Sequence, residues 1–141
     1  MLVTLAIDLA VVAAYGGVGV ALMAVGYLLV DVATPGSLRE LIWARRNRNA
    51  ALLLASGLVG VATIVTAAIA ASEGEFWTGL LGALGYGIVG LTLMSVAFLL
   101  VDIVTPGRLG EILVDPEPHP AVWISSVVHV ALGAIIAAAI L

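Results

Sequence analysis

The stretch that decides the fold is Leu28-Leu29-Val30-Asp31-Val32-Ala33-Thr34-Pro35-Gly36, because the chain contains it a second time in closely similar form. At an offset of 71 residues the sequence reads Leu99-Leu100-Val101-Asp102-Ile103-Val104-Thr105-Pro106-Gly107. In both places an apolar run ends at an aspartate, and Thr-Pro-Gly follows three residues later. Each copy therefore has the pattern of a helix that stops, turns and restarts.

The similarity extends well beyond this stretch. At the same offset, 16 of the 27 pairs from Tyr15/Tyr86 to Leu41/Ile112 are identical. The identical pairs include tyrosine, aspartate, proline and glutamate, whereas a shared apolar composition would produce only scattered matches of Ala, Val and Leu. We interpret the pattern as an internal duplication, with repeat 1 at about residues 1–71 and repeat 2 at about 72–141.

The composition is typical of an integral membrane protein. Of the 141 residues, 63% are hydrophobic and 10% are charged, and the mean hydropathy is +1.26. A soluble domain has about 25% charged residues, and a membrane-spanning helix needs about 20 apolar residues. Four uncharged runs have this length, so we expect one integral membrane domain over residues 1–141. These runs are Leu9–Val30, Ala50–Ala71, Phe76–Val101 and Ala121–Leu141.

These spans predict an all-α membrane protein with four transmembrane helices. Each repeat forms a two-span hairpin, so the two tandem hairpins are parallel and related by a pseudo-two-fold axis along the membrane normal. A short amphipathic helix is expected at the membrane surface after the first span, with Leu38, Leu41 and Ile42 on one face. Thr34 could cap this helix, with Pro35 as its first residue. Ser37 and Glu40 offer a competing start, because they have the spacing of a capping box. The prolines of Asp115–Pro120 predict an extended connector in repeat 2.

The arginines predict the orientation. All five lie in the first and third loops, and the chain has no lysine: Arg39, Arg45, Arg46, Arg48 and Arg108. The positive-inside rule puts both loops in the cytoplasm and both termini outside. The first residues have no basic region, so no cleavable signal peptide is expected.

Asp31 and Asp102 are candidate site residues with two interpretations. Because ionisable groups at membrane spans often mark ion pathways, the pair could form a cation or proton site where the repeats meet. In the structural interpretation, which we favour, each aspartate accepts hydrogen bonds from the turn at Thr34 or Thr105, or pairs with an arginine. Both residues are expected at the interface, where desolvation is mild.

His129 is the one ionisable residue well inside a predicted span. It could relay protons or contact a ligand, but a neutral histidine hydrogen-bonded to a neighbouring helix is the favoured interpretation. A bis-histidine haem is excluded within one subunit, because the only other histidine, His119, lies in a loop. The chain has no cysteine and no cluster of metal ligands, so we expect neither a cofactor nor a metal.

Two further groups of residues suggest contacts. The arginines Arg45, Arg46 and Arg48 could bind anionic lipid headgroups, or they could serve only as the topogenic signal. Small residues at helical spacing predict close helix packing. They are Gly79, Gly82, Gly87 and Gly90 in the third span, and Ser56 and Gly60 in the second.

The doubled Asp-x-x-Thr-Pro-Gly junction resembles the YjfL-like family, as does Asn49-Ala50-Ala51 at the start of the second span. This family comprises small bacterial inner-membrane proteins and is known as domain of unknown function 350. The resemblance covers essentially the whole chain. It implies a four-span protein of the bacterial plasma (inner) membrane, without an established activity. Repeat 2 lacks the Asn-x-Ala opening.

The sequence predicts no enzyme, because it contains no catalytic triad and no phosphate-binding loop. We expect a non-enzymatic membrane protein that assembles with itself or acts as an accessory or scaffold subunit of a membrane complex. The alternative is an ion or proton channel, or a small transporter, that acts as an oligomer with the pair Asp31 and Asp102. The expected partners are the lipid bilayer and other membrane subunits, with no nucleic acid.

Overall fold

The structure, a computed structural model, describes residues 1–33, 37–72, 74–104, 109–115 and 117–141. This part of the chain is helical and contains no strand. Four of its helices are long and apolar enough to cross a membrane, which confirms the expected all-α membrane fold. The elements are α1 (Leu2–Ala33), η1 (Glu40–Ala44, a π-helix), α2 (Arg48–Ala70), α3 (Phe76–Val104), α4 (Leu109–Val114) and α5 (Pro120–Ile140).

The long helices begin and end close to the predicted spans, except at the start of α1. This helix begins at Leu2 and includes Asp8, whereas the uncharged run begins at Leu9. A single carboxylate interrupts an apolar run but does not break a helix. With 32 residues, α1 is about 48 Å long, so it exceeds a hydrocarbon core of about 30 Å.

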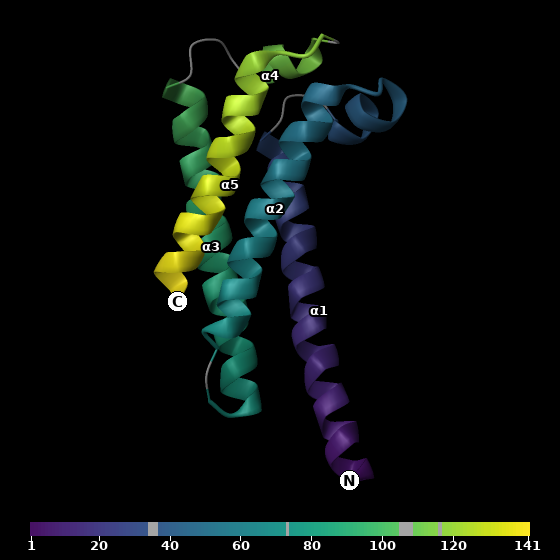
Figure 1. The fold of residues 1–141 in the computed structure, drawn as a ribbon, viewed down its shortest axis with the longest axis vertical. Helices are drawn as coiled ribbons and strands as arrows, with labels where there is room; N and C mark the ends of the chain where they lie inside the picture. Colours follow the sequence, from purple (N-terminus) through teal and green to yellow (C-terminus); the bar gives the residue numbers. More distant parts are fainter. Residues whose placement is uncertain (34–36, 73, 105–108, 116) are drawn as a thin grey trace.

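The two short helices lie at one end of the molecule. η1 and α4 are at the upper end in Figure 1, and the turn between α2 and α3 is at the lower end, together with the N-terminus. The N-terminal half of α1 projects away from the other helices (Figure 1), and residues 1–10 of the chain are all exposed.

α2 is the central helix of the bundle. It packs most extensively against α5 and also contacts α1 and α3. In the most apolar 18-residue stretch of α2, 56% is buried inside the molecule, whereas the corresponding share for α1 is 11%. The largest apolar cluster takes side chains from all four long helices: Leu22, Val61, Ile64, Val65, Leu91, Met94 and Ile136.

Glycines allow the helices to approach closely at several points. A Cβ at Gly133 would overlap the backbone of Gly60, so α2 and α5 touch there backbone to backbone. On α3, Gly87 faces Leu22 of α1 and Gly90 faces Ile64 of α2. Gly87 and Gly90 thus pack inside the monomer, where larger side chains would separate the helices.

The segment between α1 and α2, which contains η1 and is the connector of repeat 1, packs against these two helices. The backbone N–H of Glu40 donates to Ser37 Oγ at 3.4 Å, which is half of the predicted capping box. Leu38 and Leu41 are buried against a cluster that includes Val30 and Leu54. The apolar face of the connector therefore covers the ends of α1 and α2, and its position at a membrane surface stays a prediction.

The order of elements is the same in both halves, and α3 ends 71 residues after α1. The packing, however, departs from the two-fold pattern that we expect from the duplication. α2 packs along α3, whereas its counterpart pair, α1 and α5, makes little or no contact. The difference arises because α1 leans away from the bundle (Figure 1). The duplication itself stays a prediction from the sequence.

The contact between Gly60 and Gly133 gives a stability prediction. Gly133→Ala should lower the free energy of unfolding by about 1–3 kcal/mol, because two backbones must separate to admit the methyl group. The control is Gly85→Ala, since a Cβ at Gly85 meets nothing within 4 Å. Denaturant unfolding of the purified protein in mixed micelles measures both variants. Equal stability of the two would contradict the proposed backbone contact.

Candidate functional site

Two asparagines at the start of α2 bind the segment between α4 and α5, which is the connector of repeat 2. Asn47 is the N-cap of α2, and its Oδ1 accepts a hydrogen bond from the N–H of Ala50 at 3.1 Å. The same side chain donates from Nδ2 to the carbonyl oxygens of Leu113, at 2.6 Å, and Asp115, at 3.1 Å. One buried side-chain amide thus accepts from a free N–H at the start of α2 and donates to carbonyl groups of the connector.

Asn49 makes a second set of bonds to the same connector. Its Nδ2 donates to the carbonyl oxygens of Glu117, at 2.7 Å, and Asp115, at 3.2 Å. Its Oδ1 accepts from the backbone N–H of His119 at 3.2 Å. His119 in turn caps α5, because its Nδ1 accepts from the N–H of Ala121 at 3.1 Å. The start of α5 is therefore fixed to the start of α2.

The proline content of the connector explains why these amides are needed. Proline has no backbone N–H, and an extended segment makes no internal helix bonds. The carbonyl groups between α4 and α5 must therefore find donors elsewhere. Asn47 and Asn49 supply these donors and are themselves buried, at 5% and 4% exposure.

A second polar cluster lies within the packing of α2 against α5. His129 is 2% exposed, and its Nδ1 lies 3.5 Å from Ser56 Oγ, at the outer limit of hydrogen-bond distance. Its ring stacks on Phe98 of α3 with a centroid distance of 4.4 Å. Ser125 and Ser126 are buried nearby on α5, and Ser126 Oγ has no hydrogen-bond partner within the described residues. His129 thus contacts the neighbouring helix α2, and its role stays a prediction.

The structure gives Asp31 a defined backbone partner. Its Oδ1 accepts from the N–H of Leu38, at the start of the connector helix, at 3.0 Å. Asp102 is half-buried near the end of α3. The two predicted threonine partners, Thr34 and Thr105, lie outside the described residues.

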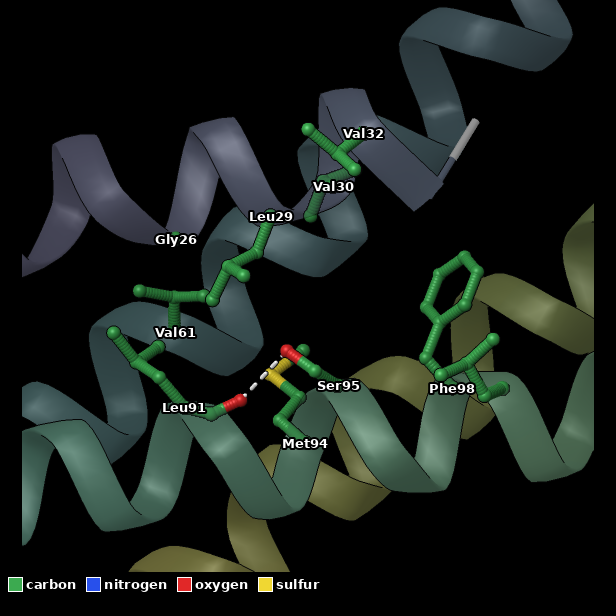
Figure 2. A pocket seen from close by; sticks show the side chains of 10 residues that line it. Gly26, Leu29, Val30, Val32, Val61, Leu91, Met94, Ser95 and Phe98 are labelled. Carbon is green, nitrogen blue, oxygen red and sulfur yellow. Dashed lines mark hydrogen bonds between the residues drawn. The ribbon is translucent and has the colours of Figure 1, made fainter. Parts of the chain in front are cut away.

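An apolar pocket of about 260 Å³ separates parts of α1 and α3, as Figure 2 shows. Its lining includes Val30, Val61 and Phe98, and its polar side chain Ser95 donates to the carbonyl of Leu91 in its own helix. Neither Asp31 nor Asp102 is among its lining residues. The pocket therefore does not bring the two aspartates into a shared site.

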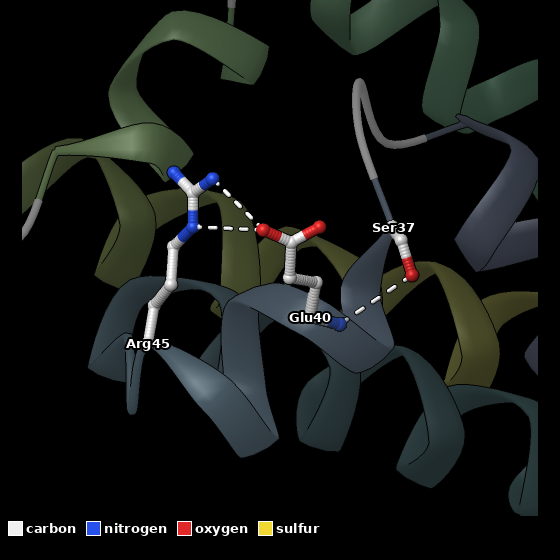
Figure 3. Close-up of polar contacts among 3 residues, drawn as sticks. All are labelled: Ser37, Glu40 and Arg45. Atoms are coloured by element: carbon white, nitrogen blue, oxygen red, sulfur yellow. Dashed lines mark hydrogen bonds and ion pairs between the residues drawn. The ribbon is translucent and has the colours of Figure 1, made fainter.

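The candidate headgroup arginines differ in their surroundings. Arg45 forms an ion pair with Glu40 at 2.9 Å, drawn in Figure 3, and both side chains are more than half exposed. Arg46 has a positive φ of 51° and is exposed. Arg48 is the first residue of α2 and is exposed. No group of three or more metal-ligating side chains occurs in the described residues.

Comparison with known proteins identifies the family. The family model "Domain of Unknown Function (DUF350)" matches residues 4–140. The chain belongs to the DUF350 family. A UPF0719 transmembrane protein of Mycobacterium bovis is 42% identical over 123 residues, which cover 87% of this chain and 81% of the relative. One of Mycolicibacterium paratuberculosis is 33% identical over 126 residues, covering 89% and 83%. No solved structure matches this DUF350 chain.

The family assignment confirms the resemblance inferred from the repeated junction. The relatives are named only as transmembrane proteins, in agreement with the four membrane-length helices of this DUF350 protein. It is therefore a small multi-pass membrane protein.

Sequence reasoning missed the bonds that Asn47 and Asn49 make to the connector. The available signal was Asn47 immediately before an apolar helix, where asparagine is a preferred N-cap. Nothing in the sequence pairs it with Leu113 or Asp115, which lie 66 and 68 residues away. The proline-rich connector could have indicated a need for donors, but not which residues supply them.

The asparagine bonds predict a coupled loss of structure. Asn49→Ala removes four hydrogen bonds, including a long one of 3.5 Å to the carbonyl of Ile112, and leaves buried carbonyls without donors. It should therefore cost about 2–4 kcal/mol of unfolding free energy. Amide hydrogen exchange over residues 112–119 should become faster at the same time. Thr63→Ala serves as the control, because the hydroxyl of Thr63 donates to Val59 within its own helix. Unchanged exchange in Asn49→Ala would contradict this function of the side chain.

Substitution of Asp31 separates its two interpretations. Asn keeps an acceptor oxygen for the N–H of Leu38, so Asp31→Asn should retain stability, whereas Asp31→Ala should lose about 0.5–2 kcal/mol. Denaturant unfolding in micelles compares the two variants. If Asp31→Asn is as destabilised as Asp31→Ala, the charge matters rather than the acceptor oxygen, and the structural interpretation of Asp31 is wrong.

Proposed function

We propose that this DUF350 protein is a non-enzymatic membrane subunit that assembles with further copies of itself. The observation that carries the proposal is the position of α1, which leaves most of its surface outside the monomer. Most of the chain lies in membrane-length helices, so contacts within the bilayer are the main surface on which it can act.

One face of α1 is suited to close helix contact. A line of small residues runs along it, and each member is exposed: Ala6, Ala10, Ala13, Gly17, Ala21 and Ala24. At 100° per residue the six lie within an arc of about 80°. Small residues on one face let a second backbone approach closely, which is how helices associate in lipid.

The small-residue face is not used by the monomer. The residues of α1 that face the bundle include Leu22, which contacts Gly87, and Gly26, which contacts Val61. They lie roughly opposite the small-residue face on a helix of 3.6 residues per turn. Assembly through this face would therefore leave the packing of α1 in the monomer intact.

We propose also that η1 and α4 lie on the cytoplasmic side of the bacterial plasma membrane. The support is the arginine content of the first and third loops. Both termini then lie outside.

The channel alternative has less support in the described residues. Thr63, Thr66 and Thr92 each donate a hydroxyl bond to a carbonyl of their own helix. Of the buried polar side chains, Ser56 of α2 and His129 of α5 lie against each other between these two helices. Neither group forms a continuous polar path along the bundle.

Two adjacent glycines test the assembly. A Cβ added at Gly16 or at Gly17 would meet nothing within 4 Å, and both residues are exposed, so the monomer has open space at either site. Gly17→Leu should shift the protein from oligomer to monomer, because the side chain lies on the small-residue face. Gly16→Leu, about 100° away around the helix, should retain the oligomer. Native mass spectrometry from lipid nanodiscs measures both.

A lone wild-type monomer without any co-purifying subunit would overturn the proposal. An equal effect of Gly16→Leu and Gly17→Leu would show that the small-residue face is not the interface. A stable complex with a different membrane protein would replace self-assembly by the accessory role.

A further inference from the structure

The end of α1 and the following connector form a small recess with polar lining. It has a volume of about 360 Å³ and is lined by Tyr27, Arg39 and Trp43. Arg39 and Trp43 are four residues apart, so they lie on one side of the connector helix, and Tyr27 comes from α1. Three groups from two elements therefore converge on one space.

Arg39 forms no ion pair in the part of the chain that the structure describes. Within the described residues, no carboxylate lies within 4.0 Å of its guanidinium group, and the ion pair is between Arg45 and Glu40. The carboxylate of Asp31 accepts the N–H of Leu38. The two nearest acidic side chains in the sequence thus have other partners, and Arg39 is available to an anion.

We propose that this recess binds the phosphate of an anionic phospholipid. A guanidinium group donates paired hydrogen bonds to phosphate oxygens, and the tyrosine hydroxyl and indole N–H supply further donors. All three side chains can donate hydrogen bonds, and Arg39 is positively charged. A headgroup with exposed acceptor oxygens therefore fits the recess, whereas a cation would be repelled by Arg39. Tyr and Trp also favour the headgroup level of a bilayer.

The surroundings favour a lipid over free phosphate. Trp43 is 66% exposed, and Val20, two turns deeper on the same face of α1 as Tyr27, is 72% exposed. An acyl chain can therefore run along α1 below a headgroup held in the recess. The assignment differs from the sequence-based candidates, because the arginine in the recess is Arg39 and not Arg45, Arg46 or Arg48.

Native mass spectrometry of the full-length protein tests the site. Phosphatidylglycerol or phosphatidylcholine is titrated into the detergent-solubilised protein, and the bound lipid is counted. The wild type should retain phosphatidylglycerol in preference to phosphatidylcholine. Arg39→Gln should weaken phosphatidylglycerol binding about fivefold or more, and Tyr27→Phe should weaken it less, because it removes one donor. A molar excess of inorganic phosphate should not displace the lipid.

Arg48→Gln is the matched control, since it removes the same charge from an exposed arginine outside the recess. It should leave binding unchanged. If Arg39→Gln and Arg48→Gln lose equal phosphatidylglycerol affinity, the binding reflects a general electrostatic attraction to the arginines, and the proposed site is wrong. Equal retention of the two lipids would also overturn it, and displacement by inorganic phosphate would exclude the lipid as ligand. The thermal stability of each variant, which should equal that of the wild type, excludes misfolding as the cause.

Discussion

The structure depends on the backbone contact between α2 and α5 at Gly60 and Gly133. In lipid, helices gain no hydrophobic free energy by associating, so close packing and interhelical hydrogen bonds must hold them together. Glycine at both positions gives the shortest separation two helices can reach. This separation brings Ser56 to His129 on one side of the contact and brings the start of α2 to the connector at the end.

The asparagines follow from the same constraint. Near the end of a bundle, a buried carbonyl without a donor costs more than a hydrogen bond contributes. The extended connector before α5 contains prolines and so has more acceptors than donors. Asn47 and Asn49 correct this imbalance only because α2 and α5 already lie close together. Helix packing and the polar bonds therefore stabilise each other.

The sequence predicted the fold more fully than the candidate site. Apolar length alone identified four spans, because the cost of burying charge in lipid leaves few alternatives. It misjudged the start of α1, since Asp8 interrupts the apolar run without breaking the helix. It could not pair Asn49 with Glu117, because a contact between residues 68 apart depends on how the helices pack. For the same reason the sequence could not distinguish Arg39 from the other arginines, because its position beside Tyr27 depends on how the first connector packs on α1.

The two halves of the chain diverge where the contacts differ. After Glu40 the first connector is helical and basic, and it packs its leucines on α1 and α2. The corresponding part of the second half is rich in proline and is held by asparagines that the second half lacks. The first half thus supplies most of the donors, and the second half supplies most of the acceptors. If a duplication produced the chain, this exchange made the halves dependent on each other, so that neither hairpin could be replaced by a second copy of its partner.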